Sequence, residues 1–138
     1  MSPSITKGSG KVLIMDDEDY IRDLFGEVLK QLGYEPTVSR HGEEALEFYK
    51  AATAAGKPFD VVILDLTVSG GLGGLDTLKE LLAINPAVKA IAASGQVSDS
   101  LVSDLQRKGF CGVLSKPCRI AEIAQTLQRV IKGDAATG

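Results

Sequence analysis

Short apolar runs, separated by amphipathic segments, most constrain how this chain can fold. The run VVIL at 61–64 is apolar throughout, and similar runs occur at 11–15, 88–94 and 112–115. A strand that is buried on both faces of a sheet has this pattern, because neither face needs polar side chains. We therefore predict strands at these positions and a further strand, EPTVS, at 35–39.

Between the predicted strands, apolar residues recur at intervals of three and four, which is typical of amphipathic helices. The first helix is predicted from Glu18 to Gly33, with an apolar stripe at Ile21, Leu24, Phe25, Val28, Leu29 and Leu32. Later helices are predicted over 42–55, roughly 74–85, near 98–108, and from Ile120 to Ile131. Five strands that alternate with five helices predict an α/β fold in three layers, with a parallel sheet between two layers of helices.

The length and charge of the chain narrow the possible functions. A chain of 138 residues predicts one domain, at 11–132, between tails at 1–10 and 133–138. The net charge of −3 offers no electrostatic support for binding nucleic acid or an anionic membrane. The apolar runs are far shorter than the roughly 20 residues that span a bilayer, and no apolar segment at the N-terminus indicates a secretory signal.

The histidine and cysteine content excludes several kinds of site. His41 is the single histidine, which rules out catalytic triads and multi-histidine metal sites, and we expect it near the start of a helix. Cys111 and Cys118 match the spacing of neither a redox pair nor a zinc site. We expect both to be reduced thiols that pack as small apolar groups, as in a cytoplasmic protein.

Charged and polar residues directly follow four of the predicted strands. The residues in question are Asp16, Asp17 and Glu18 after the first strand, Asp65 after the third, Ser94 after the fourth and Lys116 after the fifth. Because the carboxyl ends of parallel strands meet at one edge of a sheet, we expect these side chains to converge.

The convergence of several carboxylates predicts a cation and phosphoryl chemistry. Clustered carboxylates repel one another, and Lys116 alone cannot offset them. Hard oxygen ligands suit Mg²⁺, which shares its coordination between carboxylates and phosphate oxygens. Asp65 is then placed to attack phosphorus, since an aspartate carboxylate is a known nucleophile, with Lys116 and Ser94 neutralising the phosphoryl oxygens.

Four segments, VLIMDDE, VVILDLTV, AIAASG and GVLSKP, resemble in order and spacing the signature segments of response-regulator receiver domains of two-component signalling. The resemblance covers roughly residues 10–132. The stretches DLTVSGGLGG and GFCGVLSKP look most like receiver modules of hybrid sensor histidine kinases. The resemblance implies a flavodoxin-like, doubly wound sheet of five parallel strands in the order 2-1-3-4-5, with five helices.

The resemblance also implies roles for individual residues. Asp65 matches the phospho-acceptor, Lys116 the signature lysine and Ser94 the hydroxyl residue that senses the phosphoryl group. The implied Mg²⁺ ligands are Asp16, Asp17, Asp65 and the backbone carbonyl of Thr67. Such a domain takes a phosphoryl group from a phosphohistidine and changes conformation to regulate a partner or linked domain. It catalyses its own phosphorylation and slow dephosphorylation without being a stand-alone enzyme.

The implied partners are a sensor histidine kinase or a histidine phosphotransfer protein. A homodimer is compatible with the resemblance, whereas contact with nucleic acid or membrane is not expected. The chain departs from the family where an aromatic residue is common, at Val113 and Cys118, and where proline is common, at Ser69. The short, β-branched Val113 cannot act as an aromatic switch, so we expect Ser94 and the loop of residues 95–98 to carry the signal.

Two other functions share part of this pattern of residues. A magnesium-dependent phosphohydrolase of the haloacid-dehalogenase type would also form an aspartyl phosphate. Its second Asp would stand two residues beyond the nucleophile, where this chain has Thr67, and the chain has no length for a substrate-binding cap. A pseudo-receiver that only binds partners would lack part of the acidic or lysine set, which this chain keeps complete.

Overall fold

The structure is a computed structural model that describes residues 8–67, 73–116 and 118–132. Five parallel strands form one sheet in the order β2-β1-β3-β4-β5, as predicted. The strands are β1 (Lys11–Met15), β2 (Glu35–Ser39), β3 (Val61–Asp65), β4 (Ala90–Ser94) and β5 (Gly112–Ser115). The helices are α1 (Asp19–Gln31), α2 (Gly42–Ala54), α3 (Gly74–Ile84), α4 (Asp99–Lys108) and α5 (Ile120–Lys132). Residues 1–7 of the tail predicted at 1–10, the predicted tail at 133–138 and the departure at Ser69 lie outside the described residues.

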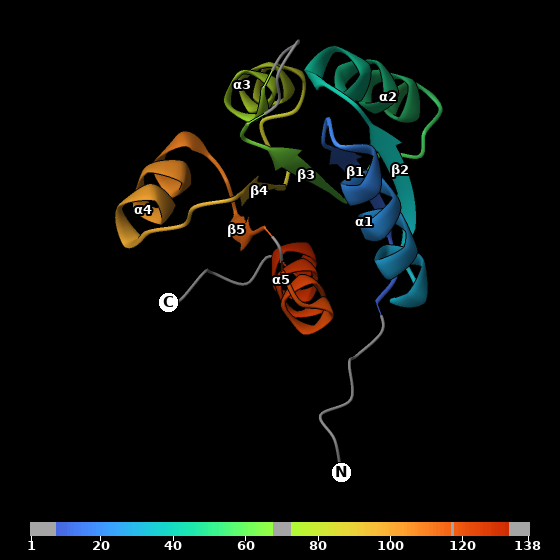
Figure 1. Cartoon of the computed structure of the whole chain (residues 1–138). Helices are drawn as coiled ribbons and strands as arrows, with labels where there is room; N and C mark the ends of the chain where they lie inside the picture. The colour runs from blue at the N-terminus through green and yellow to red at the C-terminus, as the bar shows by residue number, and fades with distance from the viewer. Residues whose placement is uncertain (1–7, 68–72, 117, 133–138) are drawn as a thin grey trace.

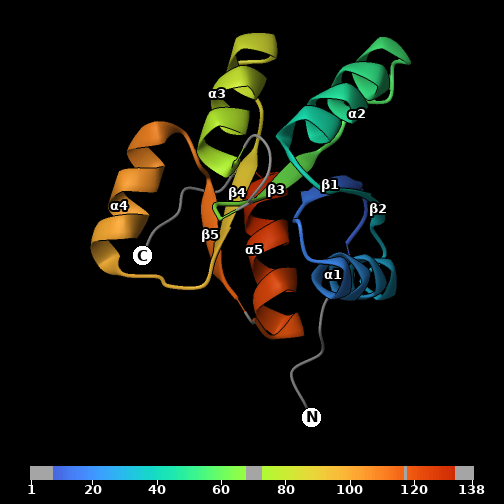
Figure 2. The same cartoon turned by 45° about the horizontal axis from the view of Figure 1, so that its top comes forward.

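Helices cover both faces of the sheet, with α1 and α5 on one side and α2, α3 and α4 on the other (Figures 1 and 2). Alternate residues of each central strand point to opposite faces, so Val12 and Ile14 pack under α1 and α5. Their neighbours Leu13 and Met15 pack under α2 and α3. This two-sided burial explains the uninterrupted apolar runs in the sequence.

The element boundaries differ slightly from the sequence-based expectation. Strand β4 begins at Ala90 rather than at Val88, because a turn at Asn85 occupies the preceding residues. The side-chain oxygen of Asn85 accepts a hydrogen bond from Ala87 N at 3.0 Å, and the backbone carbonyl of Asn85 accepts one from Val88 N. The proline of β2, Pro36, lies in an edge strand, where a missing N–H is tolerated.

Leu24 does not belong to the buried stripe of α1 as expected, because half of it is exposed. The spacing of three and four was correct for Ile21, Phe25, Val28 and Leu29, which are buried. Leu24 lies at the margin of this stripe, beside a surface cavity described below.

His41 caps the N-terminus of α2, where its Nδ1 accepts a hydrogen bond from Glu44 N, as its predicted position near a helix start suggested. Both cysteines are free thiols, half-buried against the core under α1 and α5. Burial raises the pKa of Cys118 to about 11, so its thiol is protonated at neutral pH. Among the described residues, no helix has the length and apolar content to cross a membrane.

Candidate functional site

The register of the sheet brings the predicted site residues to one edge. Met15 pairs with Leu64, so Asp16 follows β1 beside the last residue of β3, Asp65. Ser94 pairs with Ser115 across β4 and β5, which places it next to Lys116. The N–H of Lys116 donates a hydrogen bond to the Ser94 carbonyl at 2.8 Å and fixes this neighbourhood.

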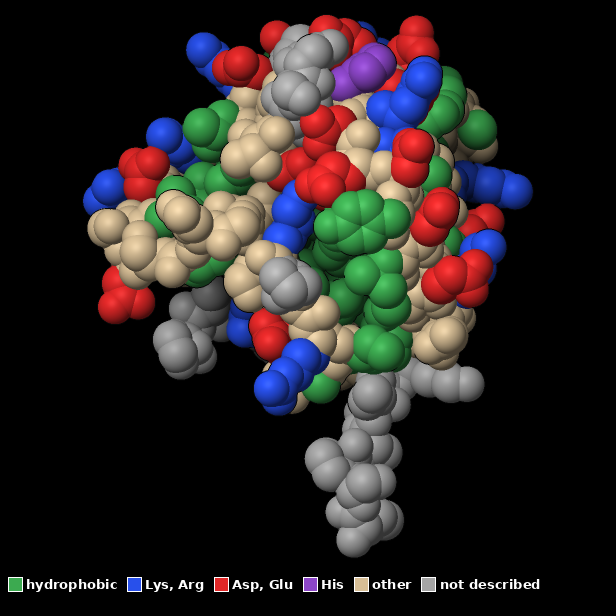
Figure 3. All heavy atoms as spheres, in the orientation of Figure 1, with side chains coloured by type: hydrophobic (Ala, Val, Ile, Leu, Met, Phe, Trp, Pro, Cys, Tyr) green, Lys and Arg blue, Asp and Glu red, His purple; other side chains and the backbone are tan. Residues whose placement is uncertain are grey.

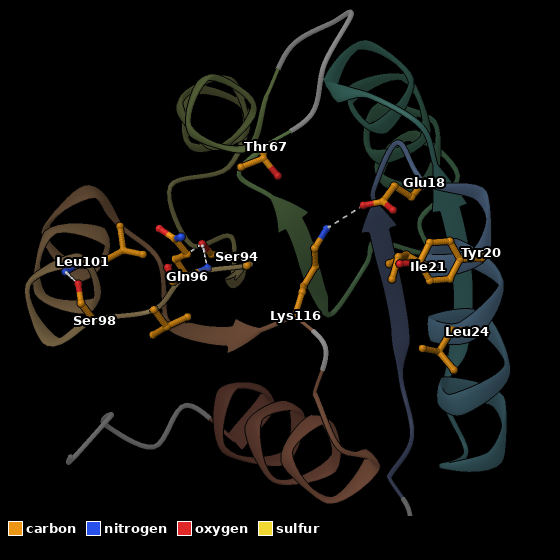
Figure 4. Close-up of a pocket in the computed structure, with 12 residues that line it drawn as sticks. Glu18, Tyr20, Ile21, Leu24, Thr67, Ser94, Gln96, Ser98, Leu101 and Lys116 are labelled. Carbon is orange, nitrogen blue, oxygen red and sulfur yellow. Dashed lines mark hydrogen bonds and ion pairs between the residues drawn. The ribbon is translucent and has the colours of Figure 1, made fainter.

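Lys116 connects the carboxylates of two strands. Its Nζ lies 2.9 Å from Asp16 Oδ2 and 3.3 Å from Asp65 Oδ2. A third carboxylate, Glu18 Oε1, lies 4.0 Å away (Figure 4). Asp16 and Asp65 are each only 1% exposed, so this is a buried ion-pair network rather than a surface contact.

The carboxylates of Asp16 and Asp65 favour the charged form of Lys116. Burial alone would lower its pKa, but the hydrogen bond and charge of Asp16, together with Asp65, outweigh burial and raise the pKa of Lys116. A raised pKa means that the folded state holds this proton more tightly than the unfolded state does. The stabilisation that this proton provides is therefore complete at pH values below the ordinary pKa of lysine. It is lost as the pH rises through the raised pKa of Lys116 in the folded state.

The two oxygens of Asp65 have different surroundings. Oδ1 accepts hydrogen bonds from the backbone N–H and the side-chain hydroxyl of Thr67, each at 3.0 Å. Oδ2 is buried and accepts no hydrogen bond from the described residues. Its 3.3 Å separation from Lys116 Nζ gives it an ionic contact without hydrogen-bond alignment. Of the two carboxylate oxygens of Asp65, Oδ2 is therefore the one that accepts no hydrogen bond from the described residues.

Three acidic residues at the end of β1 could hold a metal ion. Asp16, Asp17 and Glu18 each offer one oxygen, and these oxygens lie within 4.8 Å of one another. Asp65 adjoins this group through Lys116, which contacts both Asp16 and Asp65. One ammonium group does not neutralise four carboxylates, and an all-oxygen donor set fits Mg²⁺. Glu18 was predicted to lie at this edge of the sheet, but it was not among the Mg²⁺ ligands that the resemblance implied.

The side chain of Ser94 is held within its own loop. Its hydroxyl donates to the Gln96 carbonyl at 2.9 Å and accepts from Gln96 N at 3.3 Å. Ser94 thus lies at the predicted edge of the sheet, but its hydroxyl is hydrogen-bonded to the Gln96 backbone rather than to Asp65. Val113 is half-buried and packs with Leu101 against the core under α2, α3 and α4.

A cavity of about 830 Å³ opens over this edge of the sheet (Figure 4). Glu18, Thr67, Ser94 and Lys116 contribute its polar lining, while Tyr20, Leu24, Val97 and Leu101 contribute apolar side chains from its two sides. Figure 3 shows apolar side chains gathered beside the charged groups on this face of the molecule. The Asp65 carboxylate, the Lys116 ammonium group and the acidic cluster therefore adjoin a cavity that is partly apolar.

The sequence matches the family model described as the response regulator receiver domain over residues 12–128. This chain belongs to the response regulator receiver domain family. It is 30% identical over 123 residues to chemotaxis protein CheY of Thermotoga maritima, covering 88% of this chain and 98% of that protein. The chemotaxis response regulator CheY4 of Vibrio cholerae, crystallised at low pH, matches with a TM-score of 0.76 and 28% identity. That match covers 89% of this chain and 99% of the other.

Other relatives are longer than this chain. Response regulator GacA of Pseudomonas syringae is 31% identical over 125 residues, covering 89% of this chain and 56% of GacA. Sensor kinase CckA of Brucella abortus is 30% identical over 125 residues, covering 91% of this chain and 13% of CckA. Receiver domains accept phosphoryl groups and interact with histidine kinases or phosphotransfer proteins in two-component systems. The family and the fold predicted from the sequence are thus confirmed.

Proposed function

We propose that this receiver domain accepts a phosphoryl group from a phosphohistidine onto Asp65, with Mg²⁺, as a step of a phosphorelay. The observation that carries the proposal is the buried Oδ2 of Asp65, which accepts no hydrogen bond from the described residues and faces the ammonium group of Lys116. A buried polar atom without a hydrogen-bond partner is costly unless the site has a use for it.

In the proposed reaction, Oδ2 of Asp65 forms a bond to phosphorus as the bond from phosphorus to the donor imidazole nitrogen breaks. The nitrogen leaves with the electron pair. Lys116 lies within 3.3 Å of Oδ2 and offsets the charge of the phosphoryl oxygens. Asp16, Asp17, Asp65 and the backbone carbonyl of Thr67 are the proposed Mg²⁺ ligands. When bound, Mg²⁺ supplies positive charge for phosphoryl transfer.

The proposed response to phosphorylation begins at Ser94. Its hydroxyl is engaged with the Gln96 backbone, and a phosphoryl group offers it a charge-assisted hydrogen bond that competes with these contacts. Release of Gln96 would then move the loop of residues 95–98 ahead of α4. Val113 lacks an aromatic ring to rotate, which favours this loop as the path of the signal.

The apolar side of the cavity is the proposed contact surface for the phosphohistidine donor. Tyr20 and Leu24 are one helical turn apart on α1 and are 67% and 50% exposed. Large apolar side chains beside a reaction site are typical of a protein-binding surface, since their contact with a partner removes them from water.

Mass measurement after incubation with acetyl phosphate tests the proposed acceptor. Wild-type protein in Mg²⁺ should gain the mass of one phosphoryl group, and removal of Mg²⁺ with a chelator should prevent the gain. An Asp65→Asn variant should gain none, because its amide is not nucleophilic. Equal mass gain by the variant would refute the assignment to Asp65. No gain by folded wild-type protein would favour a pseudo-receiver, and rapid release of phosphate from organic phosphates would favour the phosphohydrolase.

Truncation of the proposed contact surface should separate the two kinds of phosphate donor. A Tyr20→Ala variant should receive phosphate from a phosphorylated histidine phosphotransfer domain about tenfold more slowly, as for loss of an interface aromatic residue. Its rate with acetyl phosphate should not change, because this small donor has no protein surface of its own that could pack against Tyr20. Phe48→Ala, which removes an exposed aromatic side chain from α2, is the matched control. Equal slowing in both variants would show that Tyr20 is not part of the contact.

A further inference from the structure

The hydroxyl of Thr67 occupies a position on Asp65 that a metal ion would need. A carboxylate oxygen offers about two lone-pair positions. Oδ1 of Asp65 already accepts two hydrogen bonds, one from Thr67 N and one from Thr67 Oγ1, both at 3.0 Å. A cation that binds Oδ1 must therefore displace one of these two donors.

The other oxygen of Asp65 is a poor position for a cation. Oδ2 lies 3.3 Å from the ammonium group of Lys116. A divalent cation at Oδ2 would be repelled by this charge at short range. Oδ1 is consequently the oxygen of Asp65 that remains for a metal, and Oδ2 remains for the reaction.

The hydroxyl is the donor that can leave. The Thr67 N–H belongs to the tight turn after β3 and is fixed by the backbone. The hydroxyl needs only a rotation about χ1, and Thr67 is exposed, so water can take over its hydrogen bond. Thr67 also lines the cavity, where its side chain has room to turn (Figure 4).

We infer that the Thr67 hydroxyl competes with Mg²⁺ for Asp65 Oδ1 and thereby lowers the metal affinity of this domain. This inference rests on the proposed function, in which Asp65 contributes to the metal site. Thr67 is then a positioning residue: without metal it holds the carboxylate with Oδ2 toward Lys116, and with metal it yields Oδ1. The side-chain role is separate from that of the Thr67 backbone carbonyl, which every variant at this position keeps.

Calorimetric titration of Mg²⁺ into wild type, Thr67→Val and Thr67→Ser proteins tests the competition. Valine keeps the shape and β-branching of threonine without the hydroxyl, so this variant should bind Mg²⁺ about three- to tenfold more tightly. Serine keeps the hydroxyl, so its affinity should stay within about twofold of wild type. Circular dichroism of each variant checks that the fold is unchanged.

Several results would overturn the inference. Unchanged or weaker Mg²⁺ binding by Thr67→Val would show that the hydroxyl does not compete, and a Thr67→Ser variant that behaves like Thr67→Val would do the same. Absence of Mg²⁺ binding by wild type would remove the competition altogether. Tighter binding by Thr67→Val, with no phosphoryl gain by any of the three proteins in acetyl phosphate, would support this inference and refute the proposed function.

Discussion

Replacement of Lys116 by methionine is expected to lower the free energy of unfolding by about 3–5 kcal/mol in metal-free buffer, the usual cost of breaking a buried ion pair. Methionine fills much of the same volume but removes the ammonium group between Asp16 Oδ2 and Asp65 Oδ2. Both carboxylates would remain buried, close together and without their cation. Urea unfolding in chelator measures the loss. Added Mg²⁺ should restore part of it, because the metal returns positive charge to the cluster.

A control with the same geometry isolates the effect of burial. Lys108 Nζ lies 2.9 Å from Asp104 Oδ2, the same distance as in the pair of Lys116 with Asp16. The Lys108 pair is nearly half exposed, so Lys108→Met should cost less than about 1 kcal/mol. Similar losses in the two variants would show that Lys116 does not stabilise a buried cluster. The Lys116→Met variant should also take up phosphate from acetyl phosphate far more slowly than wild type.

Substitution of Gly74 by alanine is expected to lower the free energy of unfolding by about 1–3 kcal/mol, as overpacking of a tight contact does. A Cβ at Gly74 would lie 2.7 Å from the carbonyl oxygen of Asp65 and 3.1 Å from its carbonyl carbon. Backbone cannot move aside as a flexible side chain does, so α3 and the end of β3 must separate. Because the displaced residue is the proposed acceptor, Asp65, phosphorylation by acetyl phosphate should also become slower.

Gly95 provides the comparison for Gly74. It lies at the same edge of the sheet, has no positive φ, and a Cβ there would meet no atom within 4 Å. The stability of Gly95→Ala should therefore stay close to that of wild type. Thermal melting of the two variants, measured side by side, checks this difference. A Gly74→Ala protein as stable as Gly95→Ala would show that the close approach of α3 to Asp65 is relaxed at little cost.

The positions of the main site residues could be predicted from the sequence because they depend on strand ends alone. Once the strands are parallel, Asp16, Asp65, Ser94 and Lys116 must reach one edge, and the register places them there. The sheet order agrees with the order implied by the resemblance. The apolar runs predicted the parallel strands, whereas the order of the strands was implied by the family resemblance and not by the runs themselves.

Contacts that depend on close approach or on rotamers could not be predicted in this way. Gly74, for example, is needed for space against the Asp65 backbone rather than for an unusual φ, and a single sequence does not show such a close approach. The hydroxyl contact of Thr67 depends on its χ1 angle, which spacing does not encode. Leu24 matched the period of a buried stripe, but a period does not show where the opposing surface ends.

Helices α1 and α4 are packed against the sheet to very different extents. Helix α1 is held to the sheet by four buried side chains, whereas α4, described over its whole length, has Leu105 as its single buried residue. Little apolar surface must be re-exposed to shift α4, so its displacement costs much less than that of α1. If Ser94 responds to phosphorylation as proposed, we expect the change to move α4 rather than α1, so that the acidic cluster beside α1 keeps its geometry.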